Sequence, residues 1–205
     1  SLINLIPRFY DVRQGEVLVD GVDVKEYPFS QLRGMIGIVP QKAVLFKGTI
    51  RHNMQWRDKN ATDEDIWNAL DIAQAKDFVE KKPDKLDEMI LQEGKNLSGG
   101  QRQRLTIARA LVGDPEILIL DDSASALDLA TDARLRKAIH EKTSGMTVFI
   151  VSQRISSIKS ADKIIVLDDG KIAGIGTHSE LYKGCEVYKE ICLSQLSEKE
   201  AQANG

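Results

Sequence analysis

The segment Pro115-Glu116-Ile117-Leu118-Ile119-Leu120-Asp121-Asp122 points to the fold class of this chain. Its four consecutive aliphatic residues lack polar alternation, which is typical of a strand in a parallel sheet that helices cover on both faces. The two carboxylates that end it are costly unless something compensates their charge, because charge beside an apolar core is poorly solvated, and Mg²⁺ shared with substrate phosphates would do so. Taken alone, the motif also fits a strand that ends in polar turn residues.

Further apolar runs with helical patterns between them predict an α/β fold with a mostly parallel sheet. The pairs Asp20-Gly21 and Asp169-Gly170 separate strand-like runs as hairpin turns do, so we expect a small antiparallel edge at each end of the chain. The other expected strands are Glu16–Asp20, Ile36–Val39, Thr147–Val151, Lys163–Leu167 and Lys171–Ile175.

Residues 46–112 contain almost no strand signal, and we expect them to form a helical subdomain inserted in the α/β core. Within it Thr62 and Asp65 have the spacing of a capping box before an amphipathic helix. Trp56 and Trp67 are expected to pack inside this subdomain. We therefore predict one domain over 1–205, with its core at 1–45 and 113–183, the helical subdomain at 46–112, and a C-terminal helix and tail at 184–205.

The composition narrows the class of protein. The chain has 205 residues, of which 42% are hydrophobic and 29% charged, and its formal net charge is −3. These values are typical of a globular protein, and without a basic excess we expect no nucleic-acid partner. The aliphatic runs are far shorter than the roughly 20 residues of a membrane helix. Cys185 and Cys192 are expected to be reduced thiols, with a disulfide or a metal site as the alternative.

A second motif, Leu97-Ser98-Gly99-Gly100-Gln101, precedes an apolar-periodic helix. Ser98 and Gln101 have the spacing of a capping box, which is its simplest interpretation. A cap does not explain the two glycines, each of which costs about 0.5–1 kcal/mol relative to alanine inside a helix. Bare N–H groups at a helix N-terminus bind anions, and glycine lets a phosphate approach without a Cβ in the way. Phosphate binding and simple capping both remain open for the motif alone.

Taken with Val39-Pro40-Gln41, Ser125-Ala126-Leu127-Asp128 and the strand before Ser152-Gln153-Arg154, these motifs resemble the nucleotide-binding domain of ATP-binding-cassette (ABC) transporters in order and spacing. The resemblance covers practically the whole chain. Residues 45–53 and 169–178 resemble the exporter branch in particular. The resemblance implies a P-loop NTPase-like core, ATP and Mg²⁺ as cofactors, and ATPase activity in the full-length complex.

The resemblance also implies roles for single residues. Gln41 corresponds to the Q-loop glutamine, Leu97–Gln101 to the signature, Asp121 to the Walker B aspartate and Ser125–Asp128 to the D-loop. Asp121, and Gln41 through water, are implied to hold Mg²⁺, while Asp122 and Gln153 occupy the catalytic positions. The residues implied to bind nucleotide are Gln41, Ser98, Gly99, Gly100, Gln101 and Asp128.

Three departures from the family pattern change the expected activity. No G-x-x-x-x-G-K-[ST] loop occurs in the sequence, although that loop should come directly before a helix such as Ser1–Ile6, which Pro7 ends. We expect that this loop has been cut away, together with a strand that would lie beside Ile117–Asp121, and that the chain alone does not hold ATP. Asp122 replaces the usual glutamate and ends about 1.5 Å short of its position. Gln153 replaces the switch histidine and cannot carry a proton.

The intact signature beside the altered Asp122 and Gln153 predicts the degenerate half of an asymmetric heterodimeric exporter. Its own site would hydrolyse ATP slowly, because misplacement near 1 Å can cost on the order of 10²-fold. Its signature would complete the competent site of a second, non-identical nucleotide-binding domain. The resemblance implies that a transmembrane domain contacts residues Gln41–Thr49, and it places the chain at the cytoplasmic face of a bacterial cell membrane. The alternatives are a regulatory half that binds ATP without hydrolysing it, and a soluble ABC protein without transport activity.

Overall fold

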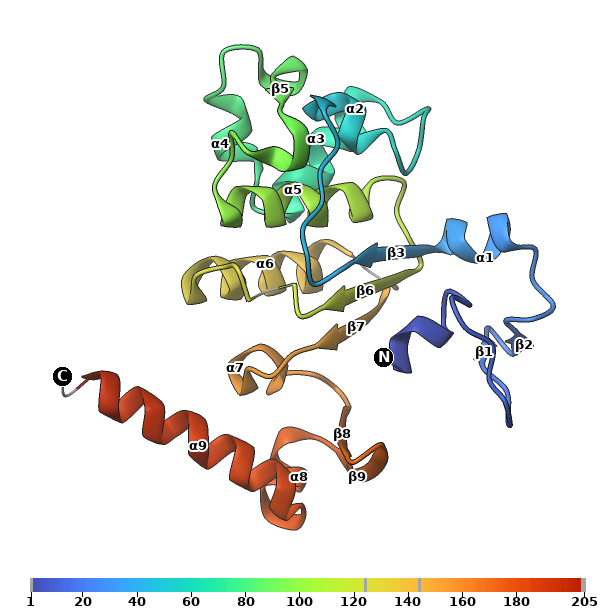
Figure 1. The fold of residues 1–205 in the computed structure, drawn as a ribbon, viewed down its shortest axis with the longest axis vertical. Coiled ribbons are helices and arrows are strands. Elements are labelled where there is room, and N and C mark those ends of the chain that lie inside the picture. Colours follow the sequence, from blue (N-terminus) through green and yellow to red (C-terminus); the bar gives the residue numbers. More distant parts are fainter. Residues whose placement is uncertain (1, 124, 144, 204–205) are drawn as a thin grey trace. The chain divides into compact units, whose positions relative to one another are not determined.

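The computed structural model describes residues 2–123, 125–143 and 145–203, with side chains through residue 195. The chain divides into two compact units, Ser1–Val151 and Ser152–Gly205. The elements of the first unit are η1 (Leu2–Leu5), β1 (Leu18–Val19), β2 (Val22–Asp23), α1 (Phe29–Met35), β3 (Ile36–Val39), β4 (Gly48–Thr49), α2 (Ile50–Met54), α3 (Asp63–Ile72), α4 (Lys76–Glu80), η2 (Lys85–Asp87), β5 (Met89–Ile90), η3 (Gln92–Gly94), α5 (Gly99–Leu111), β6 (Ile117–Asp121), α6 (Leu129–Lys142) and β7 (Thr147–Val151). The elements of the second unit are α7 (Ile155–Ile158), β8 (Ile164–Asp168), β9 (Lys171–Gly176), α8 (His178–Gly184) and α9 (Glu186–Ala203) (Figure 1).

A parallel sheet with the strand order β3-β6-β7 forms the centre of the first unit. Ile117 of β6 pairs with Ile36 of β3 on one side and with Thr147 of β7 on the other. The predicted α/β class with a parallel sheet is confirmed. The prediction of a further strand beside β6 is wrong, because both of its edges are already paired, with β3 and with β7.

Strand β6 has both faces buried, as its unbroken apolar run predicts. Leu118 and Leu120 belong to a core shared with α5 and α6, while Ile119 packs in a separate cluster with Leu32 of α1 and Val19 of β1. Successive side chains of a strand point to opposite faces, so an all-apolar strand needs two covering layers. Here α5 and α6 supply one layer, and α1 with the N-terminal hairpin supplies the other.

Strand β7 differs from that prediction, because only one of its faces is covered. Val148 and Ile150 pack against the core, whereas Phe149 and Val151 are each 37% exposed. Strand β7 is at the edge of the three-stranded sheet, and an apolar run cannot distinguish an edge strand from a central one. The prediction of two buried faces is therefore right for β6 and wrong for β7.

The two predicted hairpins are present, with shorter strands in the first. Strands β1 and β2 pair antiparallel over two residues each around Asp20-Gly21, and β8 pairs with β9 around Asp169-Gly170. Both turns have positive φ at the aspartate and at the glycine, the conformation that such pairs favour in hairpins. Each hairpin forms its own two-stranded sheet rather than an edge of the parallel one. At the N-terminus the structure has the 3₁₀ helix η1 where an amphipathic helix was predicted; Ser1 lies outside the described residues.

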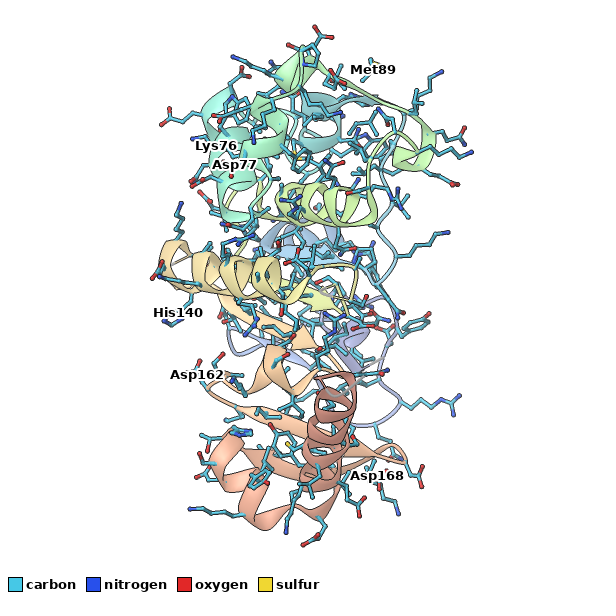
Figure 2. All side chains as sticks on the ribbon, turned by 90° about the vertical axis from the view of Figure 1, so that its left-hand side faces the viewer. Lys76, Asp77, Met89, His140, Asp162 and Asp168 are labelled. Atoms are coloured by element: carbon cyan, nitrogen blue, oxygen red, sulfur yellow. The ribbon has the colours of Figure 1, made fainter. Side chains whose placement is uncertain are left out.

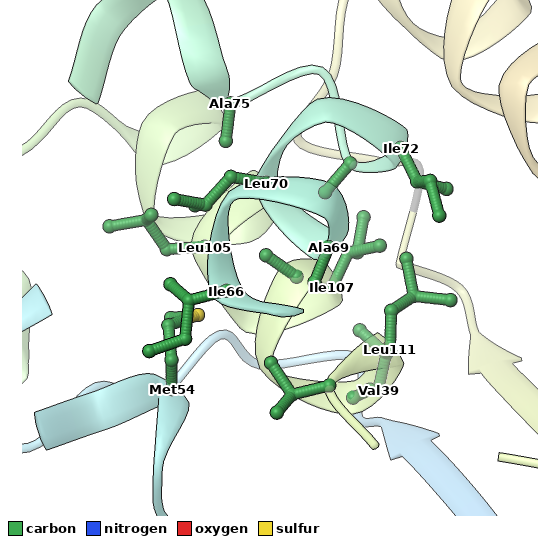
Figure 3. Packing of buried hydrophobic residues seen from close by; sticks show 14 of the residues in the cluster. Val39, Met54, Ile66, Ala69, Leu70, Ile72, Ala75, Leu105, Ile107 and Leu111 are labelled. Atoms are coloured by element: carbon green, nitrogen blue, oxygen red, sulfur yellow. The ribbon is translucent and has the colours of Figure 1, made fainter. Parts of the chain in front are cut away.

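Helices α2 to α5 gather in the predicted helical region, and they enclose most of the larger core (Figure 1). Figure 3 shows Ile66 and Leu70 of α3 directed at Leu105 of α5, with Met54 of α2 beside them. The predicted capping box of Thr62 and Asp65 begins α3. The two-residue ladder of β4 with β5, which the sequence does not indicate, joins the start of this region to the segment just before η3.

The surface of the helical region and of α6 carries both charged and apolar side chains (Figure 2). Figure 2 shows Lys76 and Asp77 at the start of α4, the 48% exposed Met89 on β5, and His140 on the exposed side of α6. Trp67 packs against the core as predicted. Trp56 stacks on Phe46 of the same region but is 56% exposed, so it packs at the surface and not in the core.

The second unit has a small core of its own. Hairpin β8–β9 contributes Ile164 and Val166, α8 contributes Leu181, and α9 contributes Tyr188 and Cys192. Cys185 and Cys192 are both buried free thiols. Among the described residues no helix is long and apolar enough to cross a membrane.

Candidate functional site

The parallel pairing of β3 and β6 brings two predicted site residues together. Val39 and Leu120 are paired, and Gln41 and Asp122 each lie two residues beyond that pair. The amide Nε2 of Gln41 donates a hydrogen bond to Oδ2 of Asp122 at 3.2 Å. The carboxyl ends of parallel strands are the usual place for a ligand site in an open α/β sheet, and this contact lies at such an edge.

The backbone at Asp122 leaves the strand sharply. Asp122 has a φ of 46°, in the left-handed region, which aspartate tolerates better than most residues. Its N–H donates to the carbonyl oxygen of Val151 at 2.9 Å, and its own carbonyl accepts from the hydroxyl of Ser125 at 2.9 Å. The turn after β6 is thereby tied to β7 on one side and to segment 125–128 on the other.

The turn Leu97–Gln101 begins α5 with the predicted capping box. Ser98 Oγ accepts from the N–H of Gln101 at 3.2 Å, and Gln101 Oε1 accepts from the N–H of Ser98 at 3.0 Å. Both side chains use an acceptor atom in this cap. The Ser98 hydroxyl hydrogen and the Gln101 amide hydrogens remain donors that can be offered to an anion.

The glycines of this turn are not required by the packing of the chain itself. A Cβ on Gly99 would come no closer than 3.9 Å to Arg102 Nη2, and one on Gly100 would lie 3.6 Å from the carbonyl oxygen of Ala126, which are ordinary contacts. By contrast, a Cβ on Gly37 of β3 would lie 2.4 Å from the carbonyl oxygen of Ala110, which α5 brings against the sheet. Internal packing therefore explains Gly37 but not the signature pair.

Three of the predicted segments line one hollow of about 360 Å³ in the first unit. Gln41 comes from the segment after β3, Gly99 from the start of α5 and Ala126 from the segment after β6. Lys42 and Lys95 also line it. The structure thus gathers the Q-loop, signature and D-loop positions around a common space with basic side chains at its border.

Asp128 has a local role that the motif comparison alone does not show. Its Oδ1 accepts from the N–H of Thr131 at 2.9 Å and its Oδ2 accepts from the Thr131 hydroxyl at 2.7 Å, so it caps the N-terminus of α6. These hydrogen bonds hold the pKa of the Asp128 carboxyl below its ordinary value. The cap is a structural role of Asp128, and its contact with nucleotide remains a prediction.

Gln153 belongs to the second unit, in which its side chain is exposed. It lies in the turn before α7, where Ser152 Oγ accepts from the N–H of Arg154 at 3.0 Å. All contacts described for this turn lie within the second unit. The catalytic role of Gln153 remains a prediction.

The residues predicted for Mg²⁺ have the chemistry that the ion prefers. Asp121 offers a carboxylate at the end of β6, and Gln41 offers an amide oxygen from the neighbouring strand end. No group of three or more metal-ligating side chains occurs in the described part of the chain. This donor set suits an ion that is held by one carboxylate together with substrate phosphates and water, and not a cage of protein ligands.

A second hollow, of about 620 Å³, lies beside the helical region; the sequence analysis predicted the contact segment that includes Phe46 but not Trp56, Arg57 or Arg109. Phe46 and Trp56 stack there with ring centroids 4.4 Å apart, and Arg109 lies over the Phe46 ring at 5.5 Å. Arg109 Nη2 donates to the carbonyl oxygen of Val44, whereas its buried Nη1 has no partner among the described residues. Burial lowers the pKa of the Arg109 guanidinium. The apolar run Val44–Phe46 beside Gln41 is the sequence signal for this surface.

Arg57 closes the inner wall of that hollow. Its guanidinium donates to the carbonyl oxygens of Val112 at 2.7 Å, Ile36 at 2.8 Å and Gly34 at 2.8 Å. These carbonyls belong to the C-terminal ends of α5 and α1 and to the start of β3. Burial lowers the pKa of the guanidinium, although the three acceptors and two helix ends compensate its charge. Nothing in the local sequence around Arg57 indicates these partners, because they are 21 to 55 residues away.

Comparison with known proteins gives consistent results. The family model described as ABC transporter matches residues 1–125. An uncharacterized ABC transporter ATP-binding protein of Mycobacterium tuberculosis is 45% identical over 198 residues, which cover 95% of this chain and 34% of the relative. The ATP-dependent lipid A-core flippase of Hahella chejuensis is 41% identical over 202 residues, covering 98% of this chain and 34% of that protein. The structure of a bacterial Atm1-family ABC exporter with ATP bound matches with a TM-score of 0.90 and 36% identity, over 95% of this chain and 34% of that one.

The family match spans more than half of this chain and includes the signature turn and both carboxylates after β6. The chain spans about a third of the length of the curated relatives described here. The structural match extends over both units and identifies the fold as that of exporter nucleotide-binding domains. The chain therefore belongs to the ABC transporter family, as an ATP-binding domain of the exporter type.

Proposed function

We propose that this chain is the ATP-binding domain of an ABC exporter, in which ATP-driven pairing with a second nucleotide-binding domain is coupled to export across a membrane. The observation that carries the proposal is the signature turn. Gly99 borders the same hollow as Gln41 and Ala126. Gly100 follows it in the turn, and the packing of the chain itself does not require either residue to be glycine. A turn with bare N–H groups is suited to the phosphates of a nucleotide bound mainly by another molecule.

The signature contributes positioned donors to that partner site. The hydroxyl of Ser98 and the first N–H groups of α5 would donate to the γ-phosphate, where negative charge increases in the transition state. The positive end of the α5 dipole acts in the same direction. The capping box holds Ser98 and Gln101 in place before nucleotide arrives, so little reorganisation is needed on binding.

The carboxylates after β6 would serve the nucleotide bound at this chain's own edge. When Mg²⁺ is bound there, it neutralises phosphate charge, and Asp121 with a water-mediated contribution from Gln41 would hold it. Asp122 would orient the attacking water, and it already accepts a hydrogen bond from Gln41. Its side chain is one carbon shorter than glutamate, and Gln153 cannot carry a proton. This site is therefore proposed to be slow, as the degenerate half of a heterodimer of two non-identical subunits.

The larger hollow supports the predicted contact with a transmembrane domain. The predicted contact region, Gln41–Thr49, contributes Phe46 to it, and Trp56 adds a second exposed ring. Exposed stacked aromatic side chains beside a guanidinium are suited to a docked helix that brings apolar side chains. Docking of this kind would put the chain at the cytoplasmic face of the membrane, and the relatives described above are bacterial.

The test restores both altered positions in the assembled transporter with Asp122→Glu and Gln153→His. We expect the ATPase rate at this site to rise by about tenfold or more, since correct placement of a catalytic group is worth up to about 10²-fold. Asp121→Asn serves as the matched control, because it removes a neighbouring carboxylate and should lower turnover. An unchanged rate in the double variant would contradict the degenerate assignment and would favour a regulatory half that only binds ATP.

A further inference from the structure

One face of the C-terminal helix α9 continues from the core of the second unit to the turn that carries Gln153. Tyr188, Cys192 and Gln195 are spaced at i, i+4 and i+7, which places them on the same side of a helix. Tyr188 is 1% exposed and Cys192 is 5% exposed, and both pack in the core with Leu181. The buried stripe therefore fixes the rotation of α9 about its axis, and Gln195 follows in the same stripe.

The side-chain amide of Gln195 is bonded at both ends to the turn before α7. Its Nε2 donates to the carbonyl oxygen of Gln153, and its Oε1 accepts from the N–H of Ile155 at 2.9 Å. A primary amide offers one donor and one acceptor side, as a peptide group does, so it binds two main-chain groups in the way a neighbouring strand would. The contact joins residues that are 40 and 42 positions apart in the chain.

These hydrogen bonds fix the main chain on both sides of Arg154. Within the turn, Ser152 Oγ accepts from the N–H of Arg154, so the turn is held from inside as well as by α9. The Gln153 side chain is exposed, and the direction in which it projects depends on this main chain. Solvent could satisfy the carbonyl of Gln153, so the contribution specific to Gln195 is orientation.

We propose that Gln195 is a positioning residue for Gln153, and that α9 thereby controls how the Gln153 side chain meets a bound nucleotide. The proposal rests on the proposed function, in which Gln153 contacts the γ-phosphate. Gln195 touches neither nucleotide nor the reacting atoms; it acts through the main chain of residues 153–155.

Two substitutions separate the donor from the acceptor. Gln195→Leu removes both hydrogen bonds. Gln195→Glu keeps an acceptor for the N–H of Ile155, but when ionised it places a second oxygen against the carbonyl of Gln153. Protonation of that carboxyl supplies an O–H that can donate to the carbonyl, so the variant should recover as the pH falls toward the ordinary glutamate pKa of about 4.3. Ser194→Ala is the matched control on the same helical turn, because its hydroxyl donates to the carbonyl oxygen of Ile191 in α9 itself.

The experiment measures the dissociation rate of radiolabelled Mg²⁺-ATP from the slow site of the assembled transporter. We expect about fivefold faster dissociation for Gln195→Leu, the factor that corresponds to weakening the single contact of a misplaced Gln153 with the γ-phosphate by about one ordinary hydrogen bond. Gln195→Glu should resemble it at pH 8 and approach the parent only at about pH 4, where a carboxyl with the ordinary glutamate pKa is mostly protonated. Ser194→Ala should match the parent throughout. Recovery within one variant on a change of pH cannot come from misfolding, so it separates positioning from stability.

Gln153→Ala and the double variant with Gln195→Leu complete the series. We expect the double variant to be no faster than Gln153→Ala alone, because residues that act through one another are not additive. A normal rate for Gln195→Leu, or a Gln195→Glu defect that does not change with pH, would overturn the role of Gln195 and leave that of Gln153 standing. If Gln153→Ala itself dissociates at the parent rate, the proposed role of Gln153 and this inference both fail.

Discussion

The two ends of α5 differ in how their unpaired backbone groups are satisfied. A helix leaves unpaired N–H groups at its start and unpaired carbonyls at its end. At the C-terminal end, the guanidinium of Arg57 takes the carbonyl of Val112 together with two carbonyls near the end of α1. At the N-terminal end, Ser98 and Gln101 cap the helix with their acceptor atoms, and Gly99 and Gly100 leave the first turn uncovered. One end is closed by the chain itself, and the other is left available to a ligand.

The difference separates residues that maintain the fold from residues that are proposed to serve a second molecule. Gly37 and Gly100 illustrate this difference, because both are glycines but only one of them is required by internal packing. Gly37 lies where α5 approaches β3, and no Cβ fits at 2.4 Å from a carbonyl oxygen. Gly100 has room for a Cβ within the described chain. If this position must be glycine, the reason is a contact with another molecule.

The largest expected effect comes from adding one methyl group at the open end. Gly100→Ala in the assembled transporter should lower the ATPase rate by about 10²-fold, the loss that follows removal or blocking of a transition-state hydrogen-bond donor. The same substitution should leave the fold intact or stabilise it by up to about 1 kcal/mol, since alanine favours a helix. Steady-state ATPase and thermal unfolding of the same preparations measure the two effects.

Gly37→Ala is the matched substitution at the closed end. It should destabilise the fold by about 1–3 kcal/mol through overpacking. If Gly100→Ala lowered stability as much as Gly37→Ala and left the ATPase rate unchanged, the distinction between the two ends would be lost.

The next largest effect concerns Arg57, whose guanidinium binds carbonyl oxygens at the C-terminal end of α5. Arg57→Met removes three charge-assisted hydrogen bonds and should destabilise the fold by about 3 kcal/mol, because buried carbonyls lose their donors. Arg57→Lys should recover only part of this, since an ammonium lacks the planar fork that reaches three carbonyls at once. Chemical denaturation of the chain gives the free energy of unfolding.

Arg13→Met provides the control for Arg57→Met, because Arg13 is an exposed side chain and such substitutions usually stay within about 0.5 kcal/mol. Equal stability of the Arg57→Met and Arg13→Met variants would show that the three carbonyls do not depend on this guanidinium.

The smallest expected effect is on the acid stability of the start of α6, where Asp128 is the N-cap residue. Its hydrogen bonds with Thr131 lower the pKa of the carboxyl in the folded state. The stabilisation is therefore present above the unfolded pKa of about 3.9 and is lost as the pH falls through the lower folded value. Asp128→Asn keeps a good N-cap residue without a titrating group, so its stability should change less with acid. Melting temperatures from neutral pH to about pH 2 test this, and a variant with the acid sensitivity of the parent would contradict it.

Elements whose cause is local could be predicted from the sequence. The capping boxes of α3 and α5, the hairpin turns and the buried strand β6 depend on residues a few positions apart, and the structure has them where the sequence indicates. Gln41 and Asp122 were also predicted as site residues from the motifs, but the hydrogen bond that joins them spans 81 positions and follows only from the pairing of β3 with β6.

What the sequence could not show depends on distant partners. The partners of Arg57 and Gln195 lie far along the chain and carry no motif, because they are main-chain atoms. The apolar run of β7 predicts a strand but not that it is an edge strand, and the exposed Trp56 has the same composition signal as a buried one. Conversely, the meaning of Gly99 and Gly100 was clearer in the sequence than in the isolated fold, since their proposed ligand belongs to another subunit.

The central claim is that the open end of α5 acts on a nucleotide held by another subunit. A cryo-electron microscopy structure of the assembled transporter with Mg²⁺-ATP tests it most directly. The account predicts Ser98 Oγ and the N–H of Gly100 at about 3 Å from γ-phosphate oxygens of a nucleotide whose remaining phosphates are bound by the partner. A signature turn that faces solvent, or a nucleotide at that turn held entirely by this same chain, would contradict it.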